Sequence, residues 1–351
     1  MKLLKPGAML LLSLLWFTAI NPAAFAAGTW TLTGSMHTAR DGHTATLLSN
    51  GNVVVAGGES NNLAIHSTEV YSPTTHAWSV TGNLNVARSH AQALRLANGL
   101  VLVAGGCVSN CQGSVTSSAE LYNSTSRVWS VTGAMTRPRT YFGAVMIAGG
   151  RILAMGGCTA LNANGCASAT ATAEIYNPAT GKWAATGSMT VARNTFTATV
   201  LPNGKVLVAG GSTAAGDSLS SSELYNPTTG TWAATGRMNV ARSDHTATLL
   251  ATGKVLAAGG ENISGTSTSK TELFNPATGT WTLTANLNSG RPTVLSSAEL
   301  YDPVARTWTR TGFLHNARAG HTSTLLPSGS VLDAAGSGPT DELISTELYA
   351  P

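Results

Sequence analysis

Residues 191–236 read VARNTFTATVLPNGKVLVAGGSTAAGDSLSSSELYNPTTGTWAATG, and this stretch decides the fold. Two short runs of strand-forming residues flank the turn Pro202-Asn203-Gly204, a pattern typical of a β-hairpin. A third run follows at SSELYNP. Residues Pro227 to Gly230 then form a second tight turn before TWAATG, because proline presets φ and glycine accepts a positive φ. The stretch therefore predicts four short antiparallel strands.

This four-stranded unit recurs along the chain with a period of about 49 residues. Each full copy except the last has an Arg, a turn Gly, a Gly pair, a Glu and a Trp in the same order, with Trp nine residues after Glu and the next Arg ten residues after Trp. The last copy has Ala335-Gly336 in place of the Gly pair. The repeated residues are Glu69, Glu120, Glu174, Glu223, Glu272, Glu299 and Glu347, with Arg40, Arg88, Arg139, Arg193, Arg242, Arg291 and Arg318. We expect these Glu and Arg residues to form buried or half-buried ion pairs between strands or between neighbouring units, because charged residues make up only 10% of the chain.

One unit is shortened, and the last unit is split between the two ends of the chain. Only eight residues separate Arg291 from Glu299, where the other copies need 29 to 35, so only the outer hairpin is expected over about residues 292–318. The final Glu347 has no Trp after it, whereas the N-terminal part begins with Trp30. We therefore expect a strand around residues 28–34 to complete the last unit and close the fold.

The Gly pair, the aromatic residue after the repeated Glu, and the spaced Trp resemble the Kelch repeat. The combination of HTATLL with GKVLVAGG is similar to exported bacterial Kelch proteins related to the central domain of galactose oxidase. The resemblance covers about residues 28 to 351. It implies an all-β Kelch-type β-propeller of four-stranded antiparallel blades, with six full blades plus one truncated blade, closed by the N-terminal strand. Whether the truncated blade fills a seventh sector or packs outside a six-sector ring stays open.

The first 26 residues have the order of a secretory signal peptide. Lys2 and Lys5 precede an apolar run from about Ala8 to Ile20, and Ala24-Phe25-Ala26 supplies a cleavage motif. A membrane anchor is the alternative, but the apolar run is short for a bilayer. We expect residues 1–26 to be removed and residues 27–351 to form the propeller, secreted, periplasmic or at the cell surface, without membrane insertion.

The charge balance is too small to favour a polyanionic partner. The chain has 20 Lys and Arg against 16 Asp and Glu, and without the first 26 residues the balance is 18 against 16, or +2. A field this weak gives no support for nucleic acid as a partner. Hydrophobic residues make up 43% of the chain, which is enough to build a core. We expect the protein to be a monomer and to need no cofactor.

Four Cys interrupt the repeat directly after two of the Gly pairs. Cys107 and Cys111 lie in one loop, and Cys158 and Cys166 lie in the same loop of the next unit. Four Cys allow three pairings, and their closeness in sequence together with export favours Cys107–Cys111 and Cys158–Cys166. A four-thiolate zinc site shared by both loops and free thiols are the alternatives.

Three His provide a second metal hypothesis. His43, His245 and His321 each lie three residues after a repeated Arg, and three imidazoles brought together could ligate copper or zinc. Ala91, Phe142 and Phe196 occupy the same position in other units, which favours a packing role instead. Galactose oxidase holds copper with two Tyr and two His, one Tyr being linked to a Cys. No such set stands out here, so the oxidase activity is not carried over.

A binding surface is expected where the loops vary. In an up-and-down blade, the loop between the second and third strands and the crossover to the next blade emerge on the face opposite the tight turns. That face carries the variable loop lengths, and binding sites favour variable loops on rigid scaffolds. The candidate ligand-binding residues there are Asp41, Glu59, His90, Tyr141, Asn194, Asp244 and Glu261. Of these, Asp41, Tyr141 and Asp244 are expected at exposed loop positions.

The expected function is that of an exported, non-catalytic binding module that uses this face to bind a protein or an extracellular glycan. The alternative is a galactose oxidase-like or other carbohydrate-active enzyme, and a structural or adhesive surface protein is a third possibility. The chain has no G-x-S-x-G, P-loop, H-E-x-x-H or dinucleotide fingerprint. No catalytic residue is therefore assigned, and whether the chain is an enzyme stays open.

Overall fold

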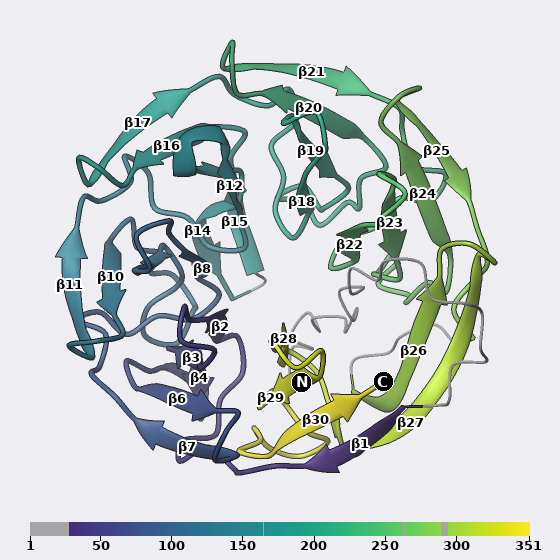
Figure 1. Ribbon diagram of the computed structural model, residues 1–351. Helices are drawn as coiled ribbons and strands as arrows, with labels where there is room; N and C mark the ends of the chain where they lie inside the picture. Colours follow the sequence, from purple (N-terminus) through teal and green to yellow (C-terminus); the bar gives the residue numbers. More distant parts are fainter. Residues whose placement is uncertain (1–27, 164, 263, 289–293) are drawn as a thin grey trace.

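The computed structural model describes residues 28–163, 165–262, 264–288 and 294–351. Six four-stranded antiparallel sheets, the blades, stand side by side around a central axis and form a β-propeller (Figure 1). The only helical element among the described residues is one 3-10 turn, η1, at Ala148–Gly150. No helix in these ranges is long and apolar enough to cross a bilayer. The predicted signal peptide, residues 1–26, lies outside the described residues.

Each blade runs from an innermost strand at the axis to an outermost strand at the rim. Blades 1 to 3 consist of β2 Thr44–Leu47, β3 Val53–Ala56, β6 Thr68–Ser72 and β7 Ala77–Val80; β8 Gln92–Arg95, β9 Val101–Ala104, β10 Ala119–Asn123 and β11 Val128–Thr132; β12 Gly143–Ile147, β13 Arg151–Met155, β16 Ala173–Asn177 and β17 Lys182–Thr186. Blades 4 to 6 consist of β18 Thr197–Val200, β19 Val206–Ala209, β20 Ser222–Asn226 and β21 Thr231–Thr235; β22 Thr246–Leu249, β23 Val255–Ala258, β24 Thr271–Asn275 and β25 Thr280–Leu283; β28 Thr322–Leu325, β29 Val331–Ala334, β30 Thr346–Ala350 and β1 Thr29–Leu32.

Two loops between the second and third strands carry short hairpins of their own. In blade 1 the hairpin is formed by β4 (Glu59–Ser60) and β5 (Leu63–Ala64). In blade 3 it is formed by β14 (Cys158–Asn162) and β15 (Gly165–Ala169). These insertions lie on the face that was predicted to carry the variable loops.

The predicted ring closure is confirmed. Strand β1 from the N-terminal end pairs with β30 from the C-terminal end, and Trp30 lies opposite Tyr349 in that pairing. The order of blade 6 is therefore β1-β30-β29-β28, with strands from both ends of the chain in one sheet. This closure ties down the two termini and leaves no open seam at this blade.

The truncated unit occupies the outer part of a seventh sector. Its hairpin consists of β26 (Leu295–Asp302) and β27 (Thr307–Arg318), and it lies at the rim between blades 5 and 6 (Figure 1). Tyr301 packs with Leu273 of blade 5, whereas Ala298 packs with Trp30 of blade 6. The hairpin thus separates two full blades. The truncated blade therefore lies in a seventh sector and does not pack outside a six-sector ring.

The core lies between adjacent blades rather than in one central mass. The largest apolar cluster between blades 1 and 6 joins Val53 and Val55 of β3 with Leu332 of β29, all at most 1% exposed. In every blade the aromatic residue after the repeated Glu packs against the repeated Trp, as in Tyr71 and Trp78, whose ring centroids are 5.2 Å apart. A single sheet could not bury both of its faces, and radial stacking solves this.

The repeated Arg and Glu form a buried clamp within each full blade, as predicted. In the six described pairs, the distance from the Arg Nη2 to the Glu Oε1 is 2.7 to 3.0 Å. In blade 1, Arg40 also donates to the carbonyl oxygens of Gly57 and Ser67. Glu69 accepts the backbone N–H groups of His37 and Thr38 from the preceding crossover. The clamp therefore joins crossover, loop and third strand; the seventh Arg, Arg291, lies outside the described residues.

Electrostatics favour the charged form of this clamp. Burial pushes the pKa of Glu69 upward, but the hydrogen bonds from His37 and the charge of Arg40 outweigh it, and the pKa lies below its ordinary value. Burial lowers the pKa of Arg40, although a guanidinium stays protonated under all ordinary conditions. The clamp is thus an ionised pair held out of water.

Candidate functional site

Three positions in each full blade meet at one end of the axis, and we call these residues the mouth ring. The first and second positions are the two residues that directly follow the repeated Arg. The third position is the residue that directly follows the Gly pair, or Ala335-Gly336 in blade 6. In every full blade the first of them forms an antiparallel bridge with the third. The mouth ring consists of Asp41, Gly42 and Glu59; Ser89, His90 and Cys107; Thr140, Tyr141 and Cys158; Asn194, Thr195 and Ser212; Ser243, Asp244 and Glu261; Ala319, Gly320 and Ser337.

The middle position of the mouth ring has a left-handed backbone in every full blade. Gly42 and Gly320 adopt φ values of 58° and 61°, which cost glycine nothing. The other four blades place His90, Tyr141, Thr195 and Asp244 there with φ between 49° and 52°. A non-glycine residue in this region is strained, and such strain is concentrated at functional sites.

Backbone hydrogen bonds connect neighbouring blades at these same residues. The N–H of His90 donates to the carbonyl oxygen of Gly42 at 2.8 Å. The N–H of Thr195 donates to Tyr141, and that of Asp244 donates to Thr195, at 3.1 and 3.0 Å. At these three positions the left-handed residue is thus tied through its N–H to the same position of the previous blade. The backbone conformation at the middle position is thus the same in all six blades, whereas the side chain at that position differs between blades.

All seven predicted ligand-binding residues belong to the mouth ring, but the expectation that Asp41, Tyr141 and Asp244 are exposed is wrong. Asp41, Glu59 and Asn194 are only 5%, 3% and 4% exposed, because the bridge between the first and third positions folds them inward. His90, Tyr141, Asp244 and Glu261 are half-buried. The accessible surface of the mouth therefore comes from the left-handed position together with Ser212, Glu261 and Ser337 of the third position.

The contacts are densest where blades 1, 2 and 3 meet. His90 Nδ1 lies 3.4 Å from Glu59 Oε1, and the His90 ring packs on Tyr141 with 4.5 Å between centroids. Ser89 Oγ donates to the same Glu59 oxygen at 2.9 Å. Where blade 1 meets blade 6, the Ser337 hydroxyl donates to Asp41.

The mouth ring is electronegative. It contains the carboxylates of Asp41, Glu59, Asp244 and Glu261 and no Lys or Arg. Burial, with the charge of Glu261 as a second cause, raises the pKa of Asp244 to about 7. Burial, followed by the charges of Glu59, Asp244 and Asp41, raises the pKa of the Tyr141 phenol. The Tyr141 hydroxyl is thus a neutral group among acids.

Two disulfides hold the loops above this ring, and both favoured pairings are confirmed. Cys107 is linked to Cys111 and Cys158 to Cys166, so none of the four Cys is a free thiol. The four-thiolate zinc site is therefore not formed. Cys107 and Cys158 occupy the third mouth-ring position of their blades and are fully buried.

The three predicted metal candidates His43, His245 and His321 lie in blade interfaces. His43 Nε2 is 2.9 Å from the Thr322 hydroxyl of blade 6, and His245 Nε2 is 3.1 Å from the Thr197 hydroxyl of blade 4. Burial lowers the pKa of His245 and His321 to about 3. Among the described residues, the one group of three or more metal-ligating side chains is Glu59, His90, Cys107 and Cys111, which includes none of these His.

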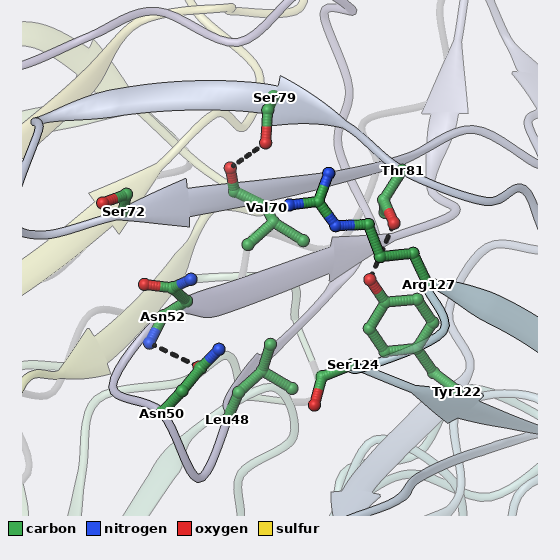
Figure 2. A pocket seen from close by; sticks show the side chains of 10 residues that line it. All are labelled: Leu48, Asn50, Asn52, Val70, Ser72, Ser79, Thr81, Tyr122, Ser124 and Arg127. Carbon is green, nitrogen blue, oxygen red and sulfur yellow. Dashed lines mark hydrogen bonds between the residues drawn. The ribbon is translucent and has the colours of Figure 1, made fainter.

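A pocket of about 260 Å³ lies on the opposite face, between the turns of blades 1 and 2 (Figure 2). Asn52 and Ser72 line it from blade 1, and Ser124 and Arg127 line it from blade 2. Blades 3 to 5 place Pro and Gly where blade 2 has Ser124 and Arg127. The turn of blade 2 therefore differs at this groove from the turns of blades 3 to 5.

Sequence reasoning missed the residues whose type carries no obvious chemistry. Ser89, whose hydroxyl contacts Glu59, and Thr195, whose backbone is left-handed, were not selected. Both could have been found by aligning the repeats and taking every residue at the same position. Asp333 was also missed, although it stands in β29 where β3, β9 and β19 have Val55, Val103 and Val208.

Comparison with known families supports the repeat assignment. A family model described as the Kelch motif matches residues 42–85, 138–190 and 193–239. These ranges include every strand of blades 1, 3 and 4. No curated protein matches the chain.

Proposed function

The chain is a Kelch-repeat β-propeller, and from this premise we propose that it is an exported, non-catalytic binding module whose mouth ring contacts a protein partner. The fold alone does not select a ligand, because propellers host many functions. The proposal therefore depends on the chemistry of the mouth ring.

The observation that carries the proposal is the contrast between a repeated backbone and unrepeated side chains. All six blades share the bridge and the left-handed turn, yet from blade 1 to blade 6 the turn presents Gly, His, Tyr, Thr, Asp and Gly around the axis. A residue that serves only packing would be expected to repeat with the backbone. The variation instead suits recognition of an asymmetric ligand.

The charge of the ring indicates the kind of partner. Of the four carboxylates in the ring, those of Asp244 and Glu261 are accessible, and with no Lys or Arg in the ring they favour a basic segment, such as a loop bearing Lys or Arg. The paired rings of His90 and Tyr141 add a π face beside them, which attracts the same cationic side chains. We therefore infer a basic protein segment as the ligand.

Export is part of the same proposal. The order of Lys2, Lys5, the apolar run and Ala24-Phe25-Ala26 supports a signal peptide. Two disulfides are compatible with an oxidising compartment. N-terminal sequencing of the secreted protein should begin at Ala27, and retention of Met1 in the mature protein would contradict export by this route.

The binding proposal is tested by screening residues 27–351 against a displayed peptide library and a glycan array. We expect selected peptides to be rich in Lys and Arg and their binding to weaken as salt increases, because the charges of the ring are partly exposed. Selection of glycans alone would instead support the alternative of a glycan-binding or carbohydrate-active protein. Selection of acidic peptides would contradict the assignment of the mouth ring.

A further inference from the structure

We propose that reduction of the Cys107–Cys111 disulfide converts one corner of the mouth ring into a site for a divalent ion such as Zn²⁺. The ligands are the Cys107 and Cys111 thiolates, an imidazole nitrogen of His90 and a carboxylate oxygen of Glu59. This site goes beyond the proposed binding function and does not depend on it.

The four groups already converge in the oxidised protein. One ligand atom from each of them lies within 4.8 Å of all the others. Glu59 Oε1 is 3.4 Å from His90 Nδ1, and Cys107 Sγ is 3.9 Å from that same nitrogen. In a tetrahedral zinc site, metal–ligand bonds of about 2.0 to 2.3 Å place neighbouring ligand atoms roughly 3.3 to 3.8 Å apart. The spacing of the oxygen, nitrogen and first sulfur is thus close to what the ion needs.

The Ser89 hydroxyl marks the point on which these groups converge. Its oxygen lies 2.9 Å from Glu59 Oε1 and 3.0 Å from His90 Nδ1. It also lies 3.0 Å from each of the two sulfurs, Cys107 Sγ and Cys111 Sγ. A single atom therefore contacts all four prospective ligands. An ion would take this place after the small Ser89 side chain rotates away.

The sequence spacing and the burial of the site agree with this chemistry. Cys107 and Cys111 are separated by three residues, within the range of paired zinc thiolates. Cys107 and Glu59 are 0% and 3% exposed, whereas His90 and Cys111 are half-buried and leave a path for the ion. Two ligands shielded from water, Cys107 and Glu59, together with two accessible ligands, His90 and Cys111, suit tight but reversible binding of the ion.

Reduction of the Cys107–Cys111 disulfide and binding of zinc are two separate steps. A dithiol reductant transfers two electrons and two protons to the disulfide, the S–S bond breaks, and the reductant becomes a disulfide. The two protein thiols then lose one proton each as two S–Zn bonds form, so binding releases two protons. In the oxidised protein only His90 and Glu59 can offer ligands, and two ligands hold zinc weakly. Redox state therefore controls occupancy.

The second disulfide provides a matched control within the same fold. Cys158 occupies the same mouth-ring position in blade 3 as Cys107 does in blade 2. However, Cys158 and Cys166 belong to no group of three or more metal-ligating side chains among the described residues. Reduction of that disulfide is expected to create no comparable site.

The test uses residues 27–351 carrying Cys158→Ser and Cys166→Ser, so that a reductant acts on one disulfide only. Zinc content is measured after dialysis, with and without a phosphine reductant, and Co²⁺ is added to detect thiolate charge-transfer absorption. We expect one equivalent of Zn²⁺ per chain in the reduced form, affinity at least a hundredfold lower in the oxidised form, and a thiolate–cobalt band. No stoichiometric zinc in the reduced chain, with the β-sheet circular dichroism intact, would overturn the proposal.

Further variants separate this site from adventitious binding. His90→Ala and Glu59→Gln should each lower zinc affinity at least tenfold, whereas Ser89→Ala should preserve or increase it by clearing the point of convergence. A reciprocal chain with Cys107→Ser and Cys111→Ser should bind no zinc after reduction. Equal zinc binding by this reciprocal chain, or unchanged affinity in His90→Ala, would contradict the assignment. Loss of the sheet signal on reduction, with no zinc bound and no recovery when Zn²⁺ is added, would also contradict it.

Discussion

Trp30 and Tyr349 come from opposite ends of the chain and lie directly across from each other in paired strands, with their ring centroids 5.2 Å apart. Trp30 is 5% exposed and belongs to one apolar cluster with Ala298 and Leu314 of the truncated hairpin and Val331 of β29. One aromatic side chain therefore closes the ring and supports the seventh sector.

Trp30→Ala should lower the free energy of unfolding by about 3–5 kcal/mol, because it removes a large buried aromatic side chain at the closure. Denaturant unfolding of residues 27–351 followed by tryptophan fluorescence and circular dichroism measures this change. Thr31→Ala, at an exposed position of the same strand, should change stability by less than about 0.5 kcal/mol and serves as the control. A loss below about 1 kcal/mol for Trp30→Ala would show that β1 does not hold the ring closed.

The clamp of Arg242 and Glu272 should show strong energetic coupling. Arg242→Met leaves a carboxylate that is 0% exposed without its cation, and this should cost about 3–5 kcal/mol. The double variant Arg242→Met/Glu272→Leu should cost less than the sum of the two single variants, with a coupling of about 2 kcal/mol. Additive losses in this double-mutant cycle would contradict an ionised, buried pair.

The repeat spacing was sufficient to predict most of the fold. The blades, the closure by Trp30 and the Arg–Glu pairs follow from residues that recur in register, because each recurrence reports a shared packing role. The placement of the outer hairpin in a seventh sector did not follow. That placement depends on contacts of Tyr301 and Ala298 with two different blades, and such contacts have no counterpart in the spacing.

The candidate site was only partly predictable. Its residues could be selected because they break the repeat, but their burial could not, since the bridge between Asp41 and Glu59 is a tertiary feature. The convergence of Glu59, His90 and Cys107 was likewise hidden, because the three come from two blades and meet only when the ring forms. A site formed by residues of two blades cannot be predicted from the sequence of a single repeat unit.

Asp333 should make stability depend on pH. Its carboxyl is 0% exposed, and burial raises its pKa to about 7. The imidazole of His321 lies 3.8 Å away but is neutral above about pH 4, because burial lowers the pKa of His321 to about 3. An unfolded Asp releases its proton near pH 4. Between these values the folded state holds a proton that the unfolded state loses, so this residue lowers the free energy of unfolding as pH rises from about 4 to about 7.

Asp333→Val, which installs the residue of β3, β9 and β19, should therefore be more stable than the parent protein by about 2 kcal/mol at pH 8. The advantage should shrink toward pH 4. Comparing the two proteins at each pH cancels the opposite effect of His43 and His245, whose lowered pKa values make the native state lose stability as pH falls. A parent protein that is more stable than the variant at pH 8 would contradict this account.

Peptide mapping without reductant should recover Cys107 joined to Cys111 and Cys158 joined to Cys166. Each bridge closes only its own loop, so reducing either one should lower stability less than a bridge across distant segments would. Peptides that connect the loops of blades 2 and 3 would refute the pairing.

The binding face can be tested with variants that leave the backbone unchanged. Asp244→Asn removes a mouth-ring charge, and asparagine tolerates the left-handed conformation that Asp244 adopts. Glu261→Gln removes a second charge. Asn203→Ala and Ser328→Ala alter turns on the opposite face and serve as controls; Asn52 is unsuitable because it lines the pocket of Figure 2.

The most direct measurement is the dissociation constant of a Lys-rich peptide from the screen, determined at pH 8, where Asp244 is ionised. The Asp244→Asn/Glu261→Gln protein should bind this peptide at least tenfold more weakly than the parent, and the Asn203→Ala/Ser328→Ala protein should bind within twofold of it. Unchanged affinity in the first double variant together with lost affinity in the second would place the binding surface on the opposite face and contradict the proposed role of the mouth ring.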